Sequence, residues 1–100
     1  MPTIYRYLGY IFKFFTNEHT PVHVHVEKQT RESKIEFNYT ADGLVLKEKK
    51  AKGKKPLTDA EIKEAKQFLS KYHLQVVAKW NQVYIFKKTV KCETISKKLK

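Results

Sequence analysis

The sequence predicts an α+β fold, in which an antiparallel meander sheet of about four or five strands packs against one long or two short C-terminal helices. Residues 3–46 contain short aromatic or β-branched runs separated by turn residues, a pattern typical of strands. Residues 58–86 then begin with a capping-box sequence and have apolar residues three or four apart, which indicates helix. One hundred residues with 41% hydrophobic content can build one core but not two, so we expect a single domain.

The first two strands are expected at residues 3–7 and 10–15, because both runs are rich in aromatic and β-branched residues. The Leu8-Gly9 pair between them suits a tight hairpin turn. Residues 16–21 interrupt the pattern with an asparagine and a proline. A third strand is then expected from about residue 22 to residue 28.

The fourth strand is predicted by alternating apolar and polar residues between Ile35 and Tyr39. A polar turn at residues 29–32 precedes it, and residues 41–43 turn the chain into a short fifth strand at residues 44–46. These connections are short, so the predicted strands follow one another as a meander.

The aromatic residues of the first two strands have two interpretations. Exposed rings on a sheet could stack on the bases of single-stranded nucleic acid. In a chain of this size, however, aromatic side chains supply most of the buried area. We favour the core for Phe12 and Phe14, and leave Tyr5, Tyr7 and Tyr10 open between the two interpretations.

The helix is expected to begin at Thr58, whose hydroxyl can accept from the backbone N–H of Glu61 while the Glu61 carboxylate reaches back. A kink or a break into two helices is expected near His73, and the β-prone residues 83–86 are expected to end the helix. One apolar stripe would face the sheet, with members at positions 62, 65, 69, 72, 76, 80 and 83.

The net charge of +11 is concentrated in two lysine-rich segments. We expect a domain over residues 1–86 with a lysine-rich loop at 47–56, followed by a basic, flexible tail at 87–100. Lysine clusters attract polyanions such as RNA or DNA, but they also serve as solubilising surface, and both interpretations stay open. The candidate nucleic-acid contacts are Lys49, Lys50, Lys52, Lys54, Lys55, Lys87 and Lys88.

Some classes of protein are disfavoured by what the sequence lacks. The single cysteine, Cys92, cannot close an internal disulfide and has no cysteine partner for a thiol-rich metal site. There is no run of about 18 apolar residues, so we expect no membrane contact and a cytoplasmic location.

Three of the four histidines, His19, His23 and His25, fall within seven positions. Successive side chains of a strand point to opposite faces, so His23, His25 and Glu27 share one face and the intervening valines share the other. The sequence therefore predicts a row of two imidazoles and a carboxylate on a strand.

Three interpretations of this row stay open. His23 and His25 could bind zinc, manganese or iron, with Glu27, or His19 or Glu18 from the preceding loop, as a third ligand. The catalytic candidates His19, His23, His25 and Glu18 could instead cleave phosphodiesters by general acid–base chemistry, as a ribonuclease does. The histidines could also be structural and tie the preceding loop to the sheet.

The same region carries a family resemblance. Aromatic residues at 10, 12 and 14, followed by Glu-His-x-Pro-x-His-Val-His-Val at 18–26, resemble a family of small bacterial proteins catalogued as domain of unknown function 4160. The likeness covers roughly residues 3–86, and the lysine-rich segments at 47–55 and after residue 86 depart from it. The resemblance implies no established activity. It implies a small single-domain protein, often encoded beside another small protein in an arrangement like a toxin–antitoxin pair. Together with the small size and the segregated lysines, the resemblance leads us to expect an interaction or accessory protein that binds a partner protein, nucleic acid, or both.

Overall fold

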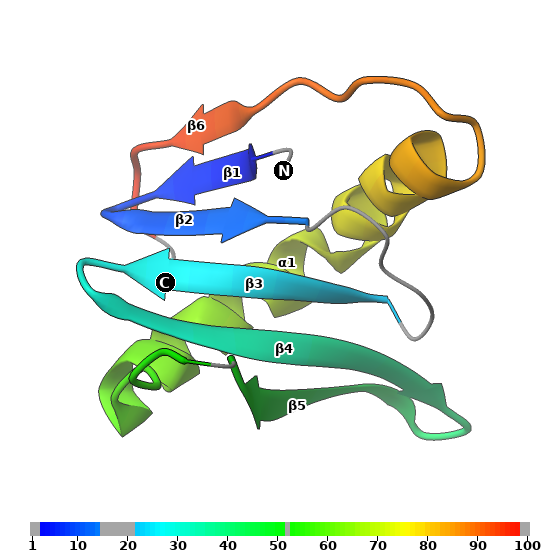
Figure 1. Ribbon diagram of the computed structural model, residues 1–100. Coiled ribbons are helices and arrows are strands. Elements are labelled where there is room, and N and C mark those ends of the chain that lie inside the picture. Colours follow the sequence, from blue (N-terminus) through cyan, green and yellow to red (C-terminus); the bar gives the residue numbers. More distant parts are fainter. Residues whose placement is uncertain (1–2, 15–21, 52, 99–100) are drawn as a thin grey trace.

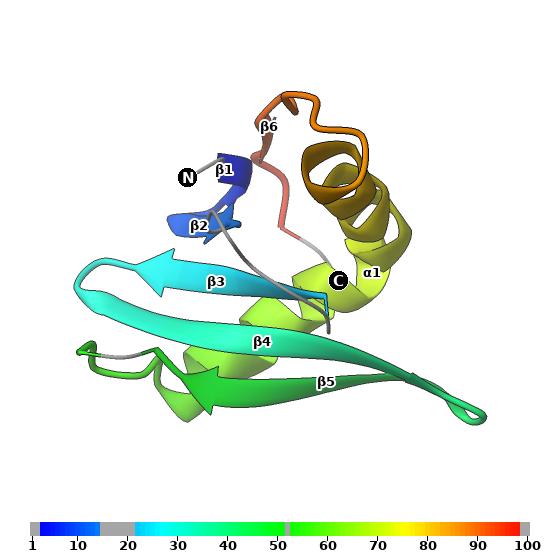
Figure 2. The same cartoon turned by 45° about the vertical axis from the view of Figure 1, so that its right-hand side comes forward.

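The computed structural model describes residues 3–14, 22–51 and 53–98, and its strands form one sheet with a helix on one face (Figures 1 and 2). The sheet has six strands in the order β5-β4-β3-β2-β1-β6. All neighbouring strands are antiparallel except β1 and β6, which are parallel. The predicted α+β class is confirmed, with a strand count slightly above the expected four or five. In chain order the elements are β1 (Thr3–Tyr7), β2 (Tyr10–Lys13), β3 (His23–Lys28), β4 (Arg31–Thr40), β5 (Gly43–Lys50), α1 (Asp59–Tyr84) and β6 (Glu93–Ile95).

The β1–β2 and β3–β4 connections are tight hairpin turns. Leu8 and Gly9 have φ values of 46° and 87°, and positive φ at both central residues is what a type I′ turn requires. The β3–β4 turn is shorter than predicted, because β4 already begins at Arg31. Glu32, which the sequence placed in this turn, instead pairs with Glu27 of β3. This shift brings Glu32 into the sheet.

The fifth strand is longer than predicted. The sequence indicated a strand at residues 44–46 and a lysine-rich loop at 47–56, but β5 continues to Lys50. The loop prediction is wrong for residues 47–50, because their backbone pairs with β4 from Glu36 to Ser33. Their side chains stay exposed at the edge of the sheet, where lysines are common.

A sixth strand lies in the segment that was predicted to be a flexible tail. Residues 93–95 form β6, and Tyr5, Arg6 and Tyr7 of β1 are its partners. Lys79 of α1 holds this segment, because its Nζ lies 2.9 Å from Glu93 Oε1 and 2.9 Å from the backbone oxygen of Lys91. The tail prediction is therefore wrong for residues 93–95.

Helix α1 begins as the sequence predicts. The Glu61 N–H donates to Thr58 Oγ1 at 3.2 Å, and the Thr58 N–H donates to Glu61 Oε1 at 2.9 Å, which completes the capping box. The predicted kink is also present, at Tyr72 with φ −105° and ψ 16°. In the part of the chain that the structure describes, no helix has both the length and the apolar character to cross a membrane.

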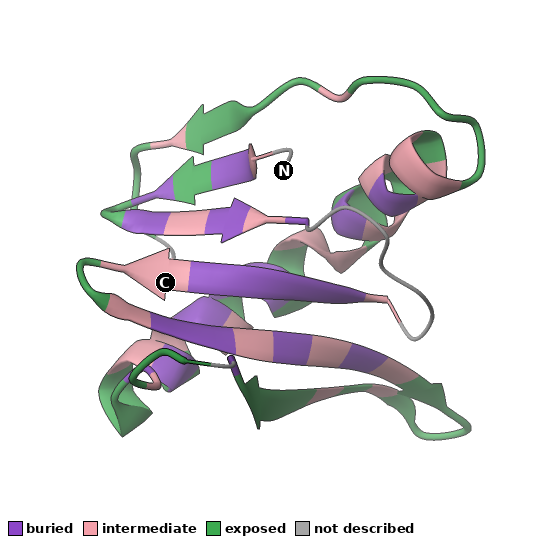
Figure 3. Cartoon of the chain, in the orientation of Figure 1, coloured by how far each residue is buried: buried purple, intermediate pink, exposed green. Residues whose placement is uncertain are grey.

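Buried residues occur on both α1 and the strands of the sheet (Figure 3). The core lies between these two layers, and aromatic rings fill much of it. Phe12 and Phe14 are buried as predicted, and Tyr5, Tyr7 and Tyr10, which the sequence left open, are buried too. The central ring is Phe68 of α1. It stacks on Tyr7 and Phe12 at centroid distances of 4.7 Å each and meets the edge of Tyr5 at 5.4 Å.

Burial of Tyr5 predicts alkaline unfolding. Burial, followed by the negative charge of Glu93, raises the pKa of Tyr5 from 10.0 to about 12. A raised pKa means that the folded state favours the neutral phenol, so this stabilisation is complete below pH 10 and is lost as the pH rises towards 12. We expect the free energy of unfolding in urea to fall across this window. The Tyr5→Phe variant should lose less stability there, and an equal loss in both proteins would contradict the assignment.

Candidate functional site

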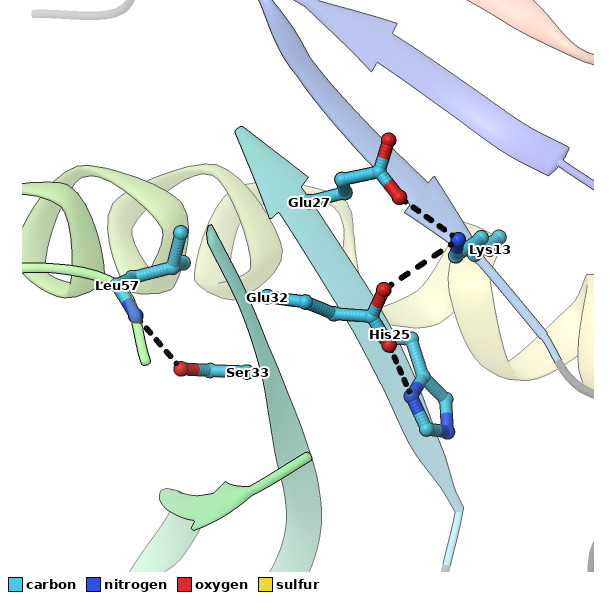
Figure 4. Close-up of polar contacts among 6 residues, drawn as sticks. All are labelled: Lys13, His25, Glu27, Glu32, Ser33 and Leu57. Atoms are coloured by element: carbon cyan, nitrogen blue, oxygen red, sulfur yellow. Dashed lines mark hydrogen bonds and ion pairs between the residues drawn. The ribbon is translucent and has the colours of Figure 1, made fainter. Parts of the chain in front are cut away.

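The face of the sheet opposite α1 carries polar side chains from neighbouring strands. Lys13 of β2 pairs with His25 of β3, and His25 in turn pairs with Lys34 of β4. Glu27 of β3 pairs with Glu32 of β4. Directly paired residues of antiparallel strands project to the same face, so these side chains gather on one side (Figure 4).

Four of these residues form a buried charge cluster, which we define as Lys13, His25, Glu27 and Glu32. His25 Nδ1 and Glu32 Oε2 lie 3.2 Å apart, and Lys13 Nζ lies 3.5 Å from Glu32 Oε1. Lys13 Nζ also donates to Glu27 Oε2 at 3.0 Å (Figure 4). Only 5% of Glu32 and 7% of His25 are exposed. The cluster thus joins β2, β3 and β4 by ionic contacts, with His25 and Glu32 buried and the Glu27 side chain 32% exposed.

The two carboxylates hold Lys13 in its charged form. Burial alone lowers the pKa of Lys13, but the hydrogen bond to Glu27 and the negative charges of Glu32 and Glu27 outweigh it, so the pKa is raised. A charged ammonium between two carboxylates is a stable arrangement for a group that is only 14% exposed.

The predicted row of His23, His25 and Glu27 lies within β3. His23 and His25 are adjacent, with ring centroids 5.7 Å apart, and the ring of His23 also lies 5.4 Å from that of Trp80 in α1. Both histidines are buried. The other two catalytic candidates, Glu18 and His19, lie outside the described residues, so the geometry of the proposed acid–base set is known only for His23 and His25.

The contact between His25 and Glu32 was missed by the sequence reasoning. Glu32 lies seven positions from His25, in a segment that looked like a turn. The signal that could have revealed it is the β3–β4 register, in which Lys28 pairs with Arg31 and Glu27 with Glu32. A two-residue turn at 29–30 would have implied this register.

The predicted metal ligands His23, His25 and Glu27 have other neighbours in the structure. Glu27 contacts Lys13 and His25 contacts Glu32. Within residues 3–14, 22–51 and 53–98, no group of three or more His, Cys, Asp or Glu side chains is arranged to hold a metal ion. Binding of zinc, manganese or iron stays a prediction.

Polar contacts of β4 fix the segment between β5 and α1. The Leu57 N–H donates to Ser33 Oγ at 3.0 Å (Figure 4). Ser33 Oγ in turn donates to Glu48 Oε2 at 2.9 Å. The Glu32 N–H donates to the backbone oxygen of Lys55 at 2.9 Å. The backbone at Lys55 and Leu57 is therefore held against the start of β4.

Part of the predicted nucleic-acid set lies at this end of β5 and in the connection that follows it. Lys49 and Lys50 end β5, while Lys54 and Lys55 follow in the connection to α1. Lys49 pairs with Lys34 of β4. We call these five residues the basic corner: Lys34, Lys49, Lys50, Lys54 and Lys55.

The remaining members of the predicted set do not join the basic corner. Lys87 and Lys88 follow the end of α1, in the connection that leads to β6. Strands β5 and β6 are the two opposite edges of the sheet, and Figure 1 shows this connection far from β5. Lys52 lies outside the described residues. The two lysine-rich segments thus form separate surfaces.

Comparison with known proteins adds one finding. A family model described as a domain of unknown function, DUF4160, matches residues 9–81. This range holds β2 to β5 and most of α1, and so includes the buried charge cluster and the basic corner, whereas β1 and β6 lie outside it. No curated protein and no solved structure gave a match.

Proposed function

This chain belongs to the DUF4160 family, and on that basis we propose that it is an interaction protein that binds nucleic acid through its basic corner. The observation that carries the proposal is the pairing of Lys34 with Lys49 across β4 and β5. Like charges directly opposite each other destabilise a sheet. A phosphate placed between the two ammonium groups would remove this repulsion.

The chemistry of the basic corner favours contact with the phosphate backbone. Lysine is a strongly hydrated point charge, whereas the guanidinium fork of arginine reads guanine or binds phosphate bidentately. The nearest arginine, Arg31, already donates from Nη1 to the backbone oxygen of Pro56 at 3.3 Å. We therefore expect binding that depends strongly on salt and little on base sequence.

A set of neutralising substitutions tests this surface. In the Lys49→Gln/Lys54→Gln/Lys55→Gln variant, three phosphate contacts are removed, so the slope of log Kobs against log salt should fall by about 2 to 3. The measurement is fluorescence anisotropy with labelled RNA and DNA oligonucleotides over a series of low salt concentrations. Circular dichroism verifies that the variant is folded.

The matched control removes the same number of positive charges from another surface. Lys87→Gln/Lys88→Gln/Lys91→Gln removes three exposed lysines from the connection to β6. If the basic corner is the interface, this control variant should keep the wild-type slope of log Kobs against log salt. Equal weakening in both variants would show an effect of net charge alone, and absence of RNA and DNA binding at low salt would reject the proposal.

We further propose that the interaction role belongs to a toxin–antitoxin-like two-gene module, as the family resemblance implies. A small protein encoded beside this chain would then be its partner. Co-expression of the two genes and affinity purification of one product test this directly. Retention of the second protein at high salt would support the module, and its absence at all salt concentrations would reject it.

A second candidate function is phosphodiester hydrolysis, because the carboxylate of Glu32 lies 3.2 Å from Nδ1 of His25. A carboxylate in this position orients an imidazole and stabilises its protonated form, which is the arrangement of many general acid–base pairs. The purified protein should then cleave RNA, and His25→Gln should abolish cleavage without loss of fold. Elemental analysis for zinc, manganese and iron separates a metal-dependent form from a histidine-based one. Loss of folding on substitution would instead support a structural histidine.

A further inference from the structure

An open cavity of about 370 Å³ lies beside the β1–β2 turn and the end of β6. It forms because β6 runs parallel to β1, so that Ile95 lies beside Tyr7 at the end where β1 turns into β2 (Figure 1). This volume falls in the range of small-molecule sites. The residues that matter for its chemistry are Arg6, Leu8, Ile11, Thr94, Ile95 and Ser96.

One wall of the cavity carries a cationic group that is available for a ligand. Arg6 is exposed, and it takes part in none of the ion pairs of the described residues. It pairs with Ile11 of β2 on one side and with Thr94 of β6 on the other, so these three residues form a row across the strands. A planar guanidinium binds carboxylate or phosphate with two parallel hydrogen bonds.

The other walls combine hydroxyl groups with apolar surface. Thr94 and Ser96 bring side-chain hydroxyls that can donate to an anion beside Arg6. Leu8, Ile11 and Ile95 add aliphatic surface, and Leu8 at the turn is 39% exposed although it is apolar. A few polar groups on a mainly apolar cavity are the usual composition of a ligand site.

We propose that this cavity binds a small amphipathic anion, in which a carboxylate or phosphate meets Arg6 and an apolar group contacts Leu8, Ile11 and Ile95. Arg6, Leu8 and β6 lie outside residues 9–81, whereas Ile11 lies inside them, so the group that would bind the anion lies outside the part of the chain that the family model covers. The inference is independent of nucleic-acid binding, because the basic corner lies near β5 at the opposite edge of the sheet.

The test compares three probes that share one ring: benzoate, phenyl phosphate and benzyl alcohol. Isothermal titration calorimetry should show binding of at least one of the two anions and much weaker binding of the uncharged alcohol. A preference between benzoate and phenyl phosphate identifies which oxyanion the site takes. Equal affinity for benzyl alcohol, or no binding of either anion, would overturn the proposal.

Substitutions locate the bound anion. Arg6→Gln should weaken binding about tenfold or more, since a hydrogen bond to a charged group is lost. Two controls should keep the wild-type affinity: Lys63→Gln, which removes an exposed charge on α1, and Lys49→Gln/Lys54→Gln/Lys55→Gln in the basic corner. If either control weakens the anion as much as Arg6→Gln does, the anion is not held in this cavity. Arg6 is exposed, so its variant is expected to fold, and circular dichroism verifies this.

Discussion

Replacing Glu32 with alanine is expected to lower the free energy of unfolding by about 3–5 kcal/mol. Glu32 is 5% exposed and contacts both His25 and Lys13. Its removal takes one of two carboxylate partners from the half-buried Lys13. It also takes a hydrogen-bonding neighbour from His25, which is only 7% exposed. Urea unfolding followed by circular dichroism measures the change in free energy.

The control for this experiment lies four positions along the same strand. Glu36 projects from the same side of β4, is only half-buried, and forms none of the ion pairs of the described residues. Glu36→Ala should change the free energy of unfolding by about 0.5 kcal/mol or less. If the two variants lose similar stability, the cluster is not a net source of stability.

Lys13 has a raised pKa, so the wild-type protein should also lose stability as the pH rises above 10.5.

Replacing Phe68 with alanine should have a similarly large effect, about 3–5 kcal/mol. Phe68 is fully buried and its ring contacts four others, those of Tyr5, Tyr7, Phe12 and Tyr72. The substitution leaves a cavity where the helix meets the centre of the sheet. A domain of this size has a total stability of about 5–15 kcal/mol, so the variant should be close to unfolding at room temperature.

Leu74 is the matched position for this second experiment. It lies on the same helix but is 69% exposed, so Leu74→Ala removes an apolar side chain without making a cavity. Its free energy of unfolding should stay within about 0.5 kcal/mol of the wild-type value. A small loss for Phe68→Ala under the same urea conditions would mean that α1 and the sheet repack around the vacated space.

Local signals in the sequence were sufficient for much of the fold. The hairpin at Leu8 and Gly9, the capping box of Thr58 and the kink near residue 72 each depend on neighbouring residues, and the structure contains all three. Phe68 was not assigned to the apolar stripe, because Ala65 and Leu69 already satisfied the helical spacing. A helix that packs on a wide sheet buries more than one line of side chains.

Features that depend on pairing between distant segments could not be predicted in the same way. Nothing in residues 47–50 favours a strand over a loop, and their conformation follows from pairing with β4. The contact between His25 and Glu32 depends on the β3–β4 register. That register follows from a turn at residues 29–30, which is two residues shorter than the predicted turn at 29–32. For the site, sequence spacing placed His23 and His25 together but gave no information about which carboxylate lies beside them.

The pairing of Tyr5 with Glu93 has a consequence for synthesis on the ribosome. Strand β1 is made early, but β6 emerges only after β2 to β5 and α1 have been completed. Until then one side of β1 presents unpaired backbone groups, which are open to pairing with other nascent chains. Contacts between residues so distant in sequence also slow folding, because closing the loop between them costs entropy before any contact is gained. The completion of β6 therefore sets the end of the period in which the newly made protein is most exposed to aggregation.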